Sequence, residues 1–147
     1  MAYNVYEIAN LILRLAYNGY GSEPISNMKL QKLLYYEQGY HLAYFGTPLF
    51  DEEIEAWKYG PVVPQIYEKY KKYENHPIMP EDGEVSISGE HYELFYNIFT
   101  FFNQYSAFGL MEKTHREDPW LLTSRNGVGP SHVIPKGLIL DFFRKAL

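Results

Sequence analysis

The segment between Ser26 and Gly46 constrains the fold more than any other part of the sequence. Ser26 is a favourable N-cap residue, and Gly46 followed by Pro48 is typical of a helix C-terminus, so we predict one helix between them. Leucine, tyrosine and phenylalanine side chains occupy most sides of this helix and do not form a single stripe. A helix that is apolar on most sides must have neighbours packed around it, so we expect it to be the centre of the core.

Two further helices are predicted in the first half of the chain. Asn4 followed by Glu7 resembles a capping box, and apolar residues then recur at helical spacing, which predicts a helix over residues 5–17. Pro64 suits the first turn of a helix because its missing N–H group costs nothing there, and we expect this helix to continue to Tyr73.

The second half of the chain predicts three more helices. Ser88 is a plausible cap for a strongly aromatic helix, which we expect to be buried, and Ser106 for a shorter helix that ends before a turn at "EDPW". "KGLILDFFRKAL" predicts a closing helix after a surface loop over residues 123–135.

Short extended pieces are expected only around residues 54–57 and 85–87. No repeat, low-complexity tract or linker divides the sequence. We therefore predict a mainly α fold, in which residues 1–147 form a single compact domain of about five to six helices with a small β-hairpin or short strands.

Composition and charge exclude several classes of function. The absence of cysteine rules out disulfides and thiolate zinc sites. A net charge of −5 weighs against nucleic acid as a partner, and the only local basic run, "KYKK" (69–72), is diluted by Glu68 and Glu74. Glu7 and Arg14 interrupt the apolar N-terminal stretch, which reads as neither signal peptide nor membrane span, so we expect a cytoplasmic protein without membrane contact.

Glu37 and His41 are the most suggestive pair for chemistry. At positions i and i+4 they share the apolar face of the predicted central helix, where they could act as an acid/base couple or, with His115 or Asp118, hold a metal ion. The alternative is a buried polar pair that satisfies itself, and we favour it because buried polar groups are routinely paired. The five histidines form no HxxxH or HExxH motif, so we expect no metal, no cofactor and no catalytic residue.

"EAWKYGPVVPQIY" (55–67) has the composition of a rigid joint between two elements. Pro61 and Pro64 lack the N–H groups that an anion-binding turn requires. Gly60 allows another element to approach closely, and Pro64 starts the next helix at a set angle. We expect Trp57 to anchor this joint in the core.

Three segments, in this order, resemble the Panacea antitoxin domain family, which is also called SocA-like and is found in phage-associated proteins. They are "MKLQKLLYYEQGYHLAYFGTPLF" (28–50), "IEAWKYGPVVPQIYEKYK" (54–71) and "THREDPW" (114–120). The resemblance implies a mostly helical bacterial or phage domain that neutralises a protein toxin encoded by an adjacent gene, usually by direct binding. It implies no catalytic residues. We expect no additional DNA-binding module.

The positions that match the family pattern are mainly apolar or turn-forming, which favours a structural role. They are Leu30, Gln31, Lys32, Leu33, Trp57, Gly60, Pro61, Val62, Thr114, His115 and Trp120. We expect Thr114 and His115 to tie the late helix to the joint by hydrogen bonds. Interface hot spots favour aromatic residues, so the candidate toxin contacts on the surface are Tyr35, Tyr59, Tyr67, Lys71 and Tyr73.

Three other functions stay open from the sequence. An adaptor that delivers a toxin to a protease also needs an aromatic surface, but it predicts that the toxin disappears. A small enzyme built on Glu37, His41 and His115 predicts bound metal or loss of function on His41→Ala. A nucleic-acid binder ranks last. The sequence also leaves open whether the chain forms a homo-oligomer.

Overall fold

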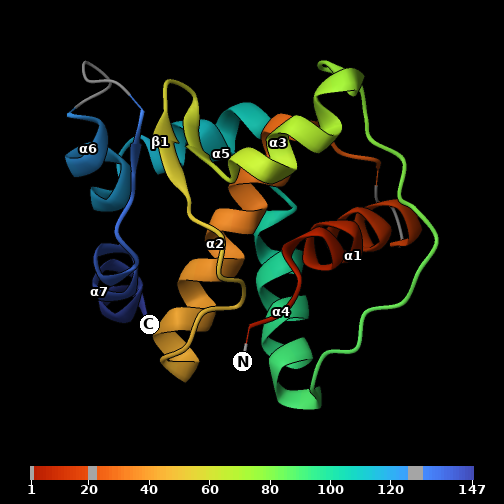
Figure 1. The fold of residues 1–147 in the computed structure, drawn as a ribbon, viewed down its shortest axis with the longest axis horizontal. Helices are drawn as coiled ribbons and strands as arrows, with labels where there is room; N and C mark the ends of the chain where they lie inside the picture. Colours follow the sequence, from red (N-terminus) through yellow and green to blue (C-terminus); the bar gives the residue numbers. More distant parts are fainter. Residues whose placement is uncertain (1, 20–22, 126–130) are drawn as a thin grey trace.

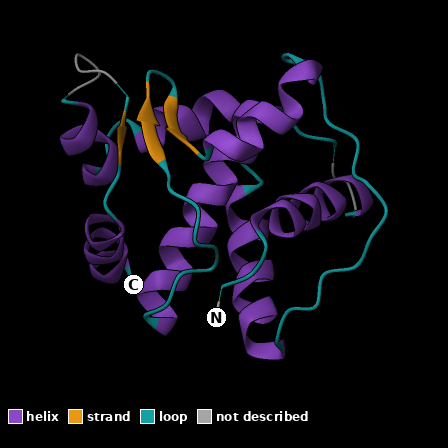
Figure 2. Ribbon diagram, viewed as in Figure 1, coloured by secondary structure: helices purple, strands orange, loops and turns teal. Residues whose placement is uncertain are grey.

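The computed structural model describes residues 2–19, 23–125 and 131–147. This part of the chain forms seven α-helices, one 3-10 helix and three short strands, so the prediction of a mainly α fold is confirmed (Figure 2). In chain order the elements are α1 (Val5–Asn18), α2 (Asn27–Phe45), β1 (Glu55–Trp57), β2 (Gly60–Val62), α3 (Pro64–Tyr70), η1 (Lys71–Tyr73), α4 (Gly89–Phe102), α5 (Ala107–Thr114), α6 (Asp118–Ser124), β3 (His132–Val133) and α7 (Lys136–Ala146).

Helix α2 is the centre of the core, as predicted. It contacts α1, α3, α4, α5, α7 and β2, and in Figure 1 it runs through the middle of the molecule. The Ser26 side chain accepts a hydrogen bond from the Lys29 amide at its start, and Gly46 ends it in the left-handed conformation with φ 74°. Most of the apolar surface that the sequence shows on this helix is therefore used for packing, although Tyr44 is exposed.

The three strands form one small antiparallel sheet in the order β2-β1-β3. Trp57 pairs with Gly60 in the hairpin of β1 and β2, and Glu55 pairs with Val133 of β3. The hairpin confirms the extended piece predicted near Trp57. Strand β3 lies in the segment predicted to be a surface loop, of which residues 126–130 are outside the described residues.

The strand predicted over residues 85–87 is absent from the described structure. The backbone of the loop between η1 and α4 bonds side chains near the N-terminus: Asn10 makes two hydrogen bonds with the backbone of Glu81, and the Ser88 amide donates to the Tyr3 hydroxyl. These contacts hold the loop against the N-terminal part of the chain, and none of them involves the backbone of residues 85–87.

Two helix predictions are also corrected. Helix α4 is buried only along Phe95, Phe99 and Phe102, whereas Tyr96 and Phe101 are exposed, so it lies at the surface with one face inward. At "EDPW" the chain does not simply turn, because Pro119 lies in the first turn of helix α6. Proline is well tolerated there, so the predicted turn is the start of a further helix.

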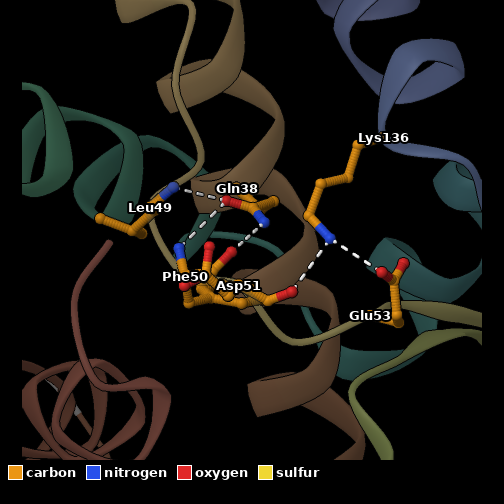
Figure 3. A network of polar contacts seen from close by, with 6 residues as sticks. All are labelled: Gln38, Leu49, Phe50, Asp51, Glu53 and Lys136. Carbon is orange, nitrogen blue, oxygen red and sulfur yellow. Dashed lines mark hydrogen bonds and ion pairs between the residues drawn. The ribbon is translucent and has the colours of Figure 1, made fainter. Parts of the chain in front are cut away.

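Gln38 of α2 fixes the path of the chain toward the sheet (Figure 3). Its side-chain oxygen accepts from the Leu49 and Phe50 amides, and its nitrogen donates to the Phe50 carbonyl at 2.8 Å. Lys136, at the start of α7, bonds the Asp51 carbonyl and the Glu53 carboxylate. The segment before β1 is therefore held against both α2 and α7. No described helix has the length and apolarity that a membrane crossing needs.

A candidate partner-binding groove

A groove of about 640 Å³ opens between the first turns of α2, the β1–β2 hairpin and α3. Trp57, Val62 and Tyr67 contribute to its mainly apolar wall, and the Trp57 and Tyr67 rings meet edge to face at 5.0 Å. Gln31 and Lys32 also line it. The groove thus brings together residues from two of the sequence segments that resemble the antitoxin family.

Buried amide side chains of α2 hold the elements around the groove together. Gln31 accepts a hydrogen bond from the Val63 amide at 2.8 Å and donates to Asn27, and Asn27 donates to the Tyr67 carbonyl. Val63 precedes α3 and has no side-chain oxygen that could cap the helix. Gln31 therefore satisfies a buried backbone donor and fixes the junction between β2 and α3.

Gly60 permits the close packing at the back of the groove. Its φ is +113°, and a Cβ atom there would lie 2.6 Å from Lys32 Cε and 3.0 Å from Thr114 Oγ1. Any larger residue would therefore displace the lysine and strain the backbone. The close approach predicted for this glycine is confirmed, and Pro64 begins α3 as predicted.

Lys32 carries a buried amine and is one of the residues that line the groove. Its side chain is 1% exposed, and Nζ donates to the Pro61 carbonyl at 3.3 Å. None of the residues that the structure describes forms an ion pair with it. Burial lowers the pKa of Lys32 from 10.5 to about 7, so water exclusion strongly disfavours its charge.

Trp120 ties the late segment to the hairpin, and Thr114 does not. The Trp120 indole N–H donates to the Trp57 carbonyl at 2.7 Å, whereas the Thr114 hydroxyl donates to Met111 within its own helix. The predicted hydrogen bond from Thr114 to the joint is therefore wrong, and Thr114 contributes by packing on Gly60.

His115 stacks on the Trp120 ring with centroids 4.0 Å apart. Its Nε2 atom is buried and has no hydrogen-bond partner among the described residues. Burial lowers the pKa of His115, and the nearby charge of Lys32 adds to this effect, while the backbone of Lys58 opposes it. His115 therefore lies close to the buried Lys32, and its own imidazole ring is favoured in the neutral form.

Glu117 forms a second buried charged cluster, which the sequence analysis missed. Tyr35 and Tyr36 each donate a hydroxyl hydrogen bond to its carboxylate at 3.0 Å, and Lys113 lies 3.6 Å from it. Burial raises the pKa of Glu117, and these partners act in the opposite direction. The sequence did contain a signal for this cluster. Two adjacent tyrosines lie on a helix predicted to be enclosed, and buried hydroxyl groups need hydrogen-bond acceptors.

The five predicted toxin contacts separate into three groups. Tyr59 is 55% exposed, and it lines the groove together with Tyr67 and Lys71. Tyr73 is partly buried against the core and is not among the residues that line the groove. Tyr35 is fully buried with its hydroxyl on Glu117, so its assignment to the surface is wrong. Neighbouring elements cover the side of α2 that carries Tyr35, which is why this tyrosine points inward.

Glu37 and His41 are buried, but they do not form the self-satisfied pair that we predicted. His41 Nδ1 lies 2.7 Å from the Thr47 carbonyl, while Glu37 Oε2 and His41 Nε2 have no partner among the described residues. Burial raises the pKa of Glu37 well above its usual range and lowers that of His41. The turn after Gly46 thus offers His41 a backbone oxygen in place of the carboxylate.

The described residues contain no group of three or more histidine and acidic side chains placed to hold a metal ion. His41 contacts the rings of Phe45 and His91, whereas His115 lies on Trp120. The structure therefore does not assemble Glu37, His41 and either His115 or Asp118 into one ligand set.

Comparison with known proteins gives a consistent family assignment. Residues 30–121 match the family described as "Antitoxin SocA-like, Panacea domain". A stretch of 44 residues is 54% identical to the antitoxin SocA of Caulobacter vibrioides (strain NA1000 / CB15N), which is 30% of this chain and 23% of that protein. The match thus spans less than a quarter of the curated relative's length, and no solved structure matches the chain. Because the family match extends over more than half of the sequence, the chain belongs to the SocA-like Panacea antitoxin family.

Proposed function

We propose that this protein is the antitoxin of a toxin–antitoxin system and that it neutralises a cognate protein toxin by binding it directly at the groove. The observation that carries the proposal is the position of the groove within the family match. Gln31, Lys32, Trp57 and Val62 all line it, and all lie within residues 30–121. An antitoxin family implies a toxin as partner, and we propose that the adjacent gene encodes it.

The groove has the features of a protein interface. Its wall and rim combine tryptophan, tyrosine and lysine side chains around a concave apolar centre, and buried aromatic anchors dominate the energy of many interfaces. A stable complex buries roughly 800 Å² on each partner, so the toxin must also cover the surface around the groove. We expect exposed Tyr59 to be part of that surface.

Co-expression tests the proposal. The toxin from the adjacent gene should arrest growth when it is expressed alone, and this chain should restore growth and co-purify with the toxin. Restored growth without any detectable complex would contradict direct binding. If the half-life of the toxin instead becomes shorter in the presence of the chain, the protein is an adaptor that delivers the toxin to a protease.

A further inference from the structure

The Lys32 amine has more hydrogen-bonding capacity than its surroundings use. An ammonium group carries three N–H donors, and the described residues supply one acceptor, the Pro61 carbonyl, at the long distance of 3.3 Å. Lys32 is 1% exposed although it lines the groove, so water offers its amine little compensation. A buried cation with one neutral acceptor is costly to the fold, so a structural role alone does not explain it.

The charges around Lys32 favour an anionic occupant. Lys58 and Lys71 line the same groove, and Glu74 is the single acidic residue among the described residues that line it. Lys71 is also only weakly engaged, because its nearest carboxylate, on Glu68, lies 3.9 Å away with both side chains exposed. The groove is therefore locally positive in a chain whose net charge is −5.

The shape and chemistry of the groove further restrict the kinds of ligand that could occupy it. Trp57, Val62 and Tyr67 present apolar surface, so a simple inorganic anion would leave most of the groove unfilled. The end of the Lys32 side chain packs into the hairpin, with Cε next to Gly60 and Nζ on the Pro61 carbonyl, so we expect a carboxylate to reach the amine only on a narrow stem. The side chain of Glu or Asp has such a stem, whereas a chain terminus would have to bring its backbone into the groove.

We propose that the groove binds a toxin segment in which an acidic side chain neighbours an apolar one, and that Lys32 forms an ion pair with the acidic side chain. This inference rests on the proposed function and names the chemistry of the partner. On binding, the carboxylate replaces the missing acceptors of the amine, and the apolar neighbour packs against Trp57 and Tyr67.

Two blocked dipeptides test the inference without knowledge of the toxin. N-acetyl-Phe-Glu-amide and N-acetyl-Phe-Gln-amide have nearly the same shape and differ by a carboxylate in place of a neutral amide, and their binding to the full chain can be followed by NMR titration at pH 6. We expect the Glu peptide to bind about tenfold more tightly and to shift the resonances of Trp57 and Gln31. Equal binding of the two peptides, or no shift at these residues, would overturn the inference.

Lys32→Met and Lys29→Met form a matched pair of variants for this titration. Lys29 lies on the same helix and donates to the Asn103 carbonyl, and it does not line the groove. Lys32→Met should abolish the preference for Glu, while Lys29→Met should keep it. A preference that survives in Lys32→Met would assign the carboxylate to a rim lysine and contradict the proposal. N-acetyl-Phe-Gln with a free C-terminal carboxylate should bind no better than its amide; tighter binding would contradict the choice of a side chain.

Co-expression with the toxin separates the two proposals. If the wild-type chain neutralises the toxin and Lys32→Met does so with unchanged affinity, direct neutralisation stands and the role of Lys32 fails. If the Glu peptide binds as expected but the wild-type chain neutralises no adjacent toxin, the groove chemistry stands and the antitoxin proposal fails.

Discussion

The cluster around Glu117 and the groove around Lys32 show two ways to bury a charged side chain in the same core. Glu117 has two tyrosine hydroxyls and Lys113 as partners. Lys32 has one backbone carbonyl and lies where the surface is hollowed. A buried charge whose partners all come from its own chain stabilises a particular packing, whereas one that lacks partners beside a groove indicates a site for another molecule.

We expect the largest change in stability at Glu117, whose hydrogen bonds are satisfied within the chain. Glu117→Leu removes the acceptor of two buried tyrosine hydroxyls, so we expect it to lower the free energy of unfolding by about 3 kcal/mol. Urea denaturation followed by circular dichroism measures this change. Glu117→Gln is the control, since its amide keeps one acceptor oxygen and should cost about 1 kcal/mol. If Glu117→Leu left the free energy of unfolding unchanged, the cluster would not be structural.

Lys32→Met should change the free energy of unfolding in the opposite direction. The variant keeps most of the side-chain volume and removes a poorly satisfied buried charge, so we expect the free energy of unfolding to rise by about 2 kcal/mol at pH 6. The same denaturation experiment measures it. If Lys32→Met destabilises the protein as Glu117→Leu does, the two regions are alike and Lys32 is a structural residue.

The lowered pKa of Lys32 also predicts how the stability of the protein depends on pH. The pKa of Lys32 is 10.5 in the unfolded chain and about 7 in the folded protein. Between these values the unfolded state binds more protons, so stability should rise with pH by at most about 1.4 kcal/mol per pH unit. Below pH 7 both states are protonated and this contribution is lost.

The difference between wild type and Lys32→Met isolates this slope. Glu37 and Glu117 also titrate abnormally, but both variants retain them, so their contributions cancel. Denaturation at several values between pH 7 and pH 10 gives the two curves. Parallel curves would contradict the lowered pKa of Lys32.

The smallest expected effect on stability is at the rim. Tyr59 and Phe108 are exposed aromatic residues, and only Tyr59 lines the groove. Truncating either to Ala should change the free energy of unfolding by less than about 0.5 kcal/mol. Tyr59→Ala should weaken toxin binding in a calorimetric titration, whereas Phe108→Ala should leave it unchanged. Equal losses would place the interface elsewhere or over both surfaces.

Much of the helical framework could be predicted from the sequence because its signals are local. Caps such as Asn4, Ser26 and Ser106 accept the expected backbone hydrogen bonds, and Pro64 starts α3. Strand β3 could not be predicted in this way, because two residues become a strand only when β1 lies beside them. The strand predicted over residues 85–87 is the converse case, since the described sheet contains only β1, β2 and β3 and gives this segment no partner.

The candidate site was harder to predict than the fold. The resemblance to the antitoxin family brought Gln31, Lys32 and Gly60 to attention, but it did not show that Gly60 leaves room for the lysine. It also did not show that Tyr35 points to Glu117. Both facts depend on contacts between segments far apart in the sequence, which periodicity and spacing do not encode.

The pKa of Lys32 in the free and ligand-bound protein shows whether this amine is a binding group. An NMR pH titration of its side chain, with and without saturating N-acetyl-Phe-Glu-amide, gives both values. We expect a pKa near 7 in the free protein and a clear rise toward the ordinary lysine value when the carboxylate is bound. A pKa near 10.5 in the free protein, or one that the peptide leaves unchanged, would contradict this prediction.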